Sequence, residues 1–202
     1  MLCAPVEPGP LELELVLERT GSLMSFLTVR AQRQKQTLLT GSLILARPRA
    51  ADADFDHLPA PALPPVESLP VFPRPPWAPA FTQHFDFRFV KGVPFTGSER
   101  GETGGWMRPL VPEPLTTPVA LALLDAWPLG ILTTLKRPRP AASVSIQFHL
   151  FPPHAPAPND AWYAVDVQTP LQREGYSDQV NSVWDGSGRL VGRAHQLVAL
   201  VR

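Results

Sequence analysis

The sequence is poor in cysteine, in lysine and in excess charge of either sign, and each shortage excludes a class of protein. Its single cysteine, Cys3, excludes an internal disulfide framework and a cysteine-rich zinc site, which fits a reducing compartment. Eighteen basic and eighteen acidic residues give zero net charge, and only three of the basic residues are lysines. Without a basic stripe, neither a nucleic acid nor an anionic membrane surface is the favoured partner.

Long uninterrupted apolar runs are also missing. Residues 118–135 come nearest, but Asp125, Pro128 and Gly130 interrupt them, so we predict a segment buried in protein and no membrane span. The first ten residues lack a basic region followed by an apolar stretch. We therefore expect no secretory signal, and a cytoplasmic protein.

The common catalytic and nucleotide-binding motifs are missing as well. The sequence has no G-x-S-x-G, no Walker loop, no H-E-x-x-H and no G-x-G-x-x-G after a predicted strand. His149 and His154 have no carboxylate beside them, which makes a metal pair the less favoured interpretation. We predict neither a metal nor another cofactor.

Proline and large aromatic rings are what the sequence has in quantity. Its 26 prolines argue against a helical bundle, because an interior proline costs a helix roughly 3 kcal/mol. Ten phenylalanines and five tryptophans supply enough apolar surface to order a core. Together these two observations favour a folded domain that is not a helical bundle.

The first strands follow from alternation of leucine and glutamate in residues 11–18. With 23–31 and 37–46 they form a predicted antiparallel meander. Residues 47–79 contain ten prolines and read as a linker or a long surface excursion. A strand over 81–89 and a glycine-rich loop over 92–105 should follow.

The second half contains one predicted helix. Thr116 and Thr117 precede Pro118, which favours a hydroxyl-capped helix over 118–126, apolar on all sides. Four strands are predicted after it, at 142–150, 162–168, 175–184 and 190–201.

A weak internal repeat relates the two halves of the chain. Residues 21–46 share length and layout with 175–199, which suggests two copies of one α+β unit, the first without its helix. The domain organisation predicted is 1–46, a partial N-terminal unit of strands only; 47–80, a proline-rich linker; and 81–202, a complete C-terminal domain.

Three features break their local pattern. Asp125 ends an apolar helix, where it either reaches solvent, bonds the following turn, or serves a function. Gln196 lies on an apolar strand face, where it either joins two strands or takes part in a site. Ser143 and Ser145 share a predicted strand face that is either solvated or functional. An acid, a hydroxyl and an amide could together hold one water molecule, with the carboxylate as base.

The chain resembles the TesB-like acyl-CoA thioesterases, which are double hotdogs. The residues that carry this resemblance are Phe85-Asp86-Phe87-Arg88-Phe89 with Gly92, Trp106-Met107-Arg108-Pro109, Leu123-Leu124-Asp125-Ala126, Ser143-Val144-Ser145-Ile146-Gln147-Phe148-His149, Gly175-Tyr176, Trp184-Asp185, Gly188-Arg189-Leu190-Val191 and His195-Gln196. In the first half, Pro5-Val6, Pro8-Gly9-Pro10 and the pair Gly21-Ser22 up to Gln32 look like the corresponding family strands.

The resemblance implies an α+β double hotdog that hydrolyses acyl-CoA with a water activated by Asp125, Ser143 and Gln196. Ser145 is the alternative hydroxyl if the strand is shifted by two residues. The first repeat is expected to lack the family's N-terminal strand and helix. A non-catalytic hotdog that binds acyl-CoA or a partner protein is the second hypothesis, and a homo-oligomer stays open.

Overall fold

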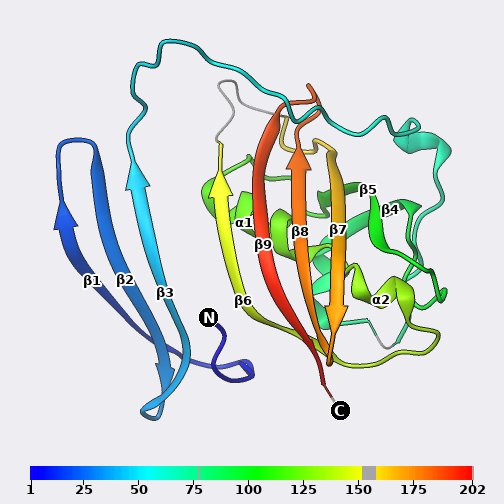
Figure 1. Cartoon of the computed structure of the whole chain (residues 1–202), viewed down its shortest axis with the longest axis horizontal. Coiled ribbons are helices and arrows are strands. Elements are labelled where there is room, and N and C mark those ends of the chain that lie inside the picture. The colour runs from blue at the N-terminus through cyan, green and yellow to red at the C-terminus, as the bar shows by residue number, and fades with distance from the viewer. Residues whose placement is uncertain (77, 152–157, 202) are drawn as a thin grey trace. The chain divides into compact units, whose positions relative to one another are not determined.

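The computed structural model describes residues 1–76, 78–151 and 158–201. The chain divides into two compact units, Met1–Asp56 and His57–Arg202 (Figure 1). Each is described by itself.

The first unit is the antiparallel meander that the alternation of leucine and glutamate predicts. Its strands β1 (Glu12–Thr20), β2 (Met24–Arg33) and β3 (Gln36–Ala46) pair in the order β1-β2-β3. The register aligns Leu13 with Ala31 and Ala31 with Leu39, so the leucines of β1 share one face with apolar residues of β2 and β3. No helix occurs among residues 1–56, all of which are described.

The second unit is a six-stranded antiparallel sheet with the strand order β4-β5-β7-β8-β9-β6. Its elements, in chain order, are η1 (Val66–Ser68), η2 (Ala80–His84), β4 (Phe85–Lys91), β5 (Gly101–Pro109), α1 (Thr117–Ala126), α2 (Ile131–Thr134), β6 (Ala141–Leu150), β7 (Tyr163–Arg173), β8 (Tyr176–Trp184) and β9 (Leu190–Leu200). The meander β7-β8-β9 repeats the order of β1-β2-β3, as the internal repeat predicts.

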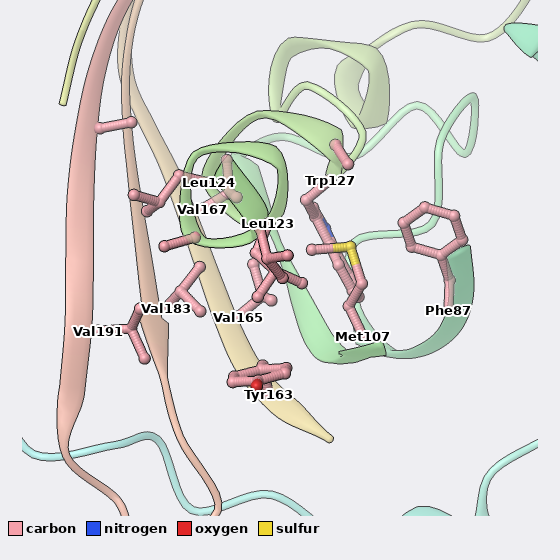
Figure 2. Close-up of a cluster of buried hydrophobic side chains, with 14 residues drawn as sticks. Phe87, Met107, Leu123, Leu124, Trp127, Tyr163, Val165, Val167, Val183 and Val191 are labelled. Carbon is pink, nitrogen blue, oxygen red and sulfur yellow. The ribbon is translucent and has the colours of Figure 1, made fainter. Parts of the chain in front are cut away.

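The helix α1 packs against the sheet strands β6, β8 and β9 (Figure 1). Leu123 and Leu124 are fully buried. In Figure 2 they point toward the valines of β7, β8 and β9, among them Val167 and Val183. A helix that is apolar on most sides is stable only in such a place, because the sheet removes its surface from water. This arrangement is the hotdog fold.

The N-terminus of α1 differs in one detail from the prediction. Thr116 is the N-cap residue and Pro118 lies in the first turn, but the Thr116 hydroxyl makes no capping hydrogen bond. The Thr116 carbonyl accepts the first bond of the helix, from the Ala120 N–H at 2.9 Å. The fixed φ of proline favours the helix start without a side-chain cap.

Three sequence-based boundaries are wrong by more than two residues. The strand expected to end at 168, β7, runs on to Arg173. The strand expected from residue 81 begins at Phe85, because Thr82 bonds back to the Pro79 carbonyl and closes the 3-10 turn η2. The expected loop over 92–105 includes the first half of β5. The glycines of β5 allow the backbones of β4 and β5 to approach closely and do not form a turn. A Cβ on Gly105 would lie 2.0 Å from the carbonyl oxygen of Arg88 in β4. Within the second unit, two strands, not one, therefore precede the helix.

Residues 57–79 belong to the second compact unit, although the sequence analysis assigned them to a linker. The indole N–H groups of Trp106 and Trp184 donate to the carbonyls of Pro64 and Leu58, at 2.9 and 2.8 Å. The Phe72 ring packs in a tilted arrangement against Phe89 of β4, with 4.5 Å between the ring centroids. The domain boundaries at 46/47 and 80/81 stay predictions.

One segment, Thr117–Thr134, is long and apolar enough to cross a membrane by length and composition alone. In the structure it comprises α1, the turn after it and the short helix α2, and half of it is buried inside the protein. The buried core helix of a hotdog domain can meet the same criteria of length and apolar composition, so these two properties do not distinguish it from a membrane span.

Candidate active site

Asp125, Gln196 and Ser143 form one chain of hydrogen bonds between α1, β9 and β6. The Gln196 amide N–H donates to Asp125 Oδ1 at 3.4 Å. The Ser143 hydroxyl donates to Gln196 Oε1 at 2.8 Å. Because a carboxylate only accepts hydrogen bonds, the amide nitrogen faces Asp125 and the amide oxygen faces the serine. The three residues that the sequence singled out thus lie together, although Gln196 is 71 positions from Asp125 and 53 positions from Ser143 in the chain.

A β-bulge decides which serine joins them. The pairing of β6 with β9 shifts between Ser143 and Ser145, so that Ser143 pairs with Val198 and Ser145 with Leu197. Directly paired residues share a face of the sheet. Val198 is buried and Leu197 is 41% exposed, so Ser143 faces inward and Ser145 outward. The prediction that both serines share one face is wrong, because the bulge breaks strict alternation.

Asp125 is partly exposed to solvent and partly surrounded by apolar protein. Its side chain is exposed to a cavity of about 770 Å³ that Ser143 also lines. The walls are mainly apolar and include Phe72, Phe87 and Trp127. Solvent reaches the carboxylate through the cavity, but burial by the surrounding protein raises its pKa above the ordinary value, while the hydrogen bond from Gln196 acts in the opposite direction. A carboxylate with a raised pKa is a better proton acceptor.

Gln196 is only 1% exposed and is not among the residues that line the cavity. Gln196 therefore connects Asp125 and Ser143, which both line the cavity, from a position buried inside the protein. The carboxylate keeps a second oxygen, and the serine oxygen keeps its lone pairs, for a molecule in the cavity. The arrangement can hold one water between a base and a hydrogen-bond acceptor.

A second group of buried polar side chains, Asn181 and Gln179, holds the turn that follows Asp125, and neither residue is among the predicted site residues. Asn181 of β8 donates to the Leu124 carbonyl at 2.7 Å, and Gln179 accepts from the Gly130 N–H at 2.8 Å. Gln179 also donates to Asn181 at 2.8 Å. These bonds tie both ends of the turn after α1 to the sheet. Gln179 and Asn181 alternate along β8 with the buried residue Val183, so all three side chains lie on the same face of the strand. Two amides on an apolar strand face are the pattern in the sequence that could have indicated this group.

No group of three or more histidine, cysteine, aspartate or glutamate side chains that could hold a metal occurs in the part of the chain that the structure describes. His149 lies on the outer face of β6, opposite Arg193, and its ring hydrogen-bonds to Gln147 at 3.0 Å. His154, the other member of the pair considered above, lies outside the described residues.

One family model matches most of the second unit. Residues 59–200 match the family model described as the acyl-CoA thioesterase C-terminal domain. A search of curated proteins gives no match.

Solved structures share the fold over 94% or more of this chain. A hotdog-fold protein of unknown function from Alicyclobacillus acidocaldarius is 24% identical, with a TM-score of 0.87 over 100% of this chain and 76% of its own. A putative thioesterase II from Thermobifida fusca is 22% identical, with a TM-score of 0.80 and the same coverage. The acyl-CoA thioesterase II TesB2 from Mycobacterium marinum is 17% identical, with a TM-score of 0.70 over 94% of this chain and 73% of its own. Similarity at these identities establishes the hotdog fold.

Proposed function

The chain belongs to the acyl-CoA thioesterase C-terminal domain family, and from this membership we propose that it hydrolyses acyl-CoA to a free acid and CoA. The observation that carries the proposal is the hydrogen-bonded chain of Asp125, Gln196 and Ser143 at an apolar cavity. Such a cavity suits an acyl group, and the polar chain suits the water that attacks it.

Asp125 is the proposed general base. A water in the cavity donates one hydrogen to the free oxygen of Asp125 and the other to the Ser143 oxygen, whose own hydrogen is held by Gln196. As the water oxygen bonds to the thioester carbonyl carbon, its proton passes to Asp125. The carbon–sulfur bond then breaks, and the CoA sulfur takes the proton from Asp125. The products are a carboxylic acid and a thiol, and the carboxylate is regenerated.

Gln196 is proposed as a positioning residue, because it is buried behind the two groups that face the cavity. Its amide has a donor for the acid and an acceptor for the hydroxyl, so one side chain serves both groups. The experiment that tests the function is release of free thiol from acyl-CoA by the purified protein. Tight binding of acyl-CoA without thiol release would instead favour the non-catalytic hypothesis.

The two serines of β6 give a matched pair of variants. We expect Ser143→Ala to lower kcat about 10- to 100-fold, because the water loses one of its two fixed partners. Ser145→Ala removes the same hydroxyl from the outer face, and its kcat should stay within about two-fold of the native value. The measurement is steady-state thiol release at saturating acyl-CoA. A larger loss in Ser145→Ala than in Ser143→Ala would overturn the assignment.

The pH dependence follows from the raised pKa of Asp125. The base acts as the carboxylate, so kcat/KM should rise with pH through the pKa of Asp125 and then level off. Because burial raises this pKa, the midpoint of the acid limb should lie above that of an ordinary aspartate. Rates measured from about pH 3.5, below the ordinary aspartate pKa of about 3.9, up to about pH 8 test this, with folding checked at each pH. A rate that does not fall on acidification while the protein stays folded would contradict Asp125 as base.

A further inference from the structure

The charged side chains that line the cavity are unequal in sign. Among the described residues, they are one acid, Asp125, and two cations, Arg74 and Arg139. The remaining walls consist mostly of phenylalanine, proline and other apolar residues. A ligand that suits this surface has an apolar part for the walls and negative charge for the arginines.

Both arginines keep most of their hydrogen-bonding capacity. Arg139 Nε donates to the Val201 carbonyl at 3.3 Å, and Arg74 donates to the Phe85 carbonyl at 3.4 Å. Within the described ranges, neither takes part in an ion pair, whereas Arg88 and Arg108 both pair with Asp86. A guanidinium carries five N–H donors, so each of the two cavity arginines has donors left for an anion.

Arg139 belongs to the most basic short segment of the chain. Lys136, Arg137 and Arg139 lie within four consecutive residues, and no acidic residue occurs between positions 126 and 159. All three cations are exposed. Pro138 and Pro140 flank Arg139 and restrict its backbone, which lowers the entropy lost when the arginine binds a ligand.

The distance from this segment to the reacting groups suits an extended ligand. Arg139 immediately precedes the Pro140 that leads into β6, and Ser143 is four residues further along. Four residues of extended chain span about 13 Å. The pantetheine arm that joins the thioester of acyl-CoA to its diphosphate has, when extended, a length of this order.

We propose that Arg139, supported by Lys136 and Arg137, binds the phosphate groups of the CoA moiety while the acyl group occupies the apolar cavity. The proposal rests on the proposed function and adds the part of the site that recognises the leaving group. Arginine suits this role because its planar guanidinium binds a phosphate through two parallel hydrogen bonds.

The test compares two substrates with the same acyl group, its CoA thioester and its pantetheine thioester, which has no phosphate. Arg139→Gln should raise KM for the CoA thioester about ten-fold, the effect of one charge-assisted hydrogen bond, and should change KM for the pantetheine thioester far less. The matched control is Arg189→Gln, an exposed arginine in the hairpin at the opposite end of β9 from Val201. Its KM for both substrates should stay native.

Ionic strength provides a second readout that a structural role would not move. Added salt should raise KM for the CoA thioester of the native protein, and Arg139→Gln should reduce this salt dependence. An equal rise in KM for both substrates in Arg139→Gln would overturn the proposal, because the pantetheine thioester carries no charge for the arginine to bind.

The two proposals fail in different ways. If the native protein hydrolyses both thioesters and Arg139→Gln treats them alike, the phosphate site is wrong and the activity stands. If neither thioester is hydrolysed, the activity is wrong, and calorimetry with CoA itself tests the site. A Kd about ten-fold weaker in Arg139→Gln than in the native protein supports it, and an unchanged Kd overturns it.

Discussion

Replacing Asp125 by asparagine is expected to lower kcat/KM for acyl-CoA about 10²- to 10⁴-fold, the usual contribution of a general base. The amide has nearly the shape of the carboxylate, and its oxygen still accepts the hydrogen bond from Gln196. It cannot take a proton from water. The measurement is thiol release with a single acyl-CoA, native against Asp125→Asn, with substrate binding measured in parallel.

The same variant should not lose stability, which separates a catalytic role from a structural one. Burial raises the pKa of Asp125 in the folded protein, so at neutral pH the folded state holds a carboxylate at a free-energy cost. Asparagine removes this cost. The variant's Tm should therefore equal or exceed the native Tm at pH 7. The difference should shrink as pH falls through the folded pKa and disappear below the unfolded pKa, where the native side chain is neutral in both states.

Two outcomes would contradict this account. Full activity in Asp125→Asn would exclude the carboxylate as base. A lower Tm together with lost activity would indicate that Asp125 holds the helix end in place and that the loss is structural. Thermal unfolding at several pH values from about 3, below the ordinary aspartate pKa of about 3.9, up to about 8 distinguishes these outcomes.

The sequence predicts elements whose signal is local. Alternation of leucine and glutamate specifies β1, and an apolar run that begins near Pro118 and ends before Pro128 specifies α1. Asp125 and Gln196 stand out for the same reason, since each is polar where its element is apolar. The expectation that both belong to one cluster came from the family resemblance, and their hydrogen bond gives that cluster its geometry.

Features that depend on two strands at once escaped prediction. The bulge in β6 turns Ser143 inward, and it is defined only by the pairing of β6 with β9. The glycines of β5 resemble a loop in isolation, but they are required because Gly105 lies against the backbone of β4. The cavity escaped as well, because Phe72 enters its wall from a proline-rich segment with no periodicity.

Trp127 packs beside the same site, and Trp127→Ala is expected to lower the free energy of unfolding of the protein by about 3 to 5 kcal/mol. Trp127 follows α1 directly and is only 1% exposed. Its ring packs at 4.8 Å on Phe89 and edge-on at 5.7 Å to Phe87, and its N–H donates to the Thr103 hydroxyl at 3.0 Å. Alanine would remove the ring contacts and leave the buried hydroxyl without its donor. Trp127 and Met107 of β5 belong to the same buried cluster (Figure 2).

The control is the same substitution at the surface of the sheet. Trp106 is half-buried on the outer face of β5 and donates its N–H to the Pro64 carbonyl, so Trp106→Ala should cost about 1 kcal/mol. Trp127→Phe should fall between the two, since it keeps a ring and loses the hydrogen bond. Urea unfolding of the full chain measures all three. Equal losses of unfolding free energy in Trp127→Ala and Trp106→Ala would mean that the ring contacts of Trp127 do not stabilise the core. The turn after Asp125 would then be held by the hydrogen bonds of Gln179 and Asn181 alone.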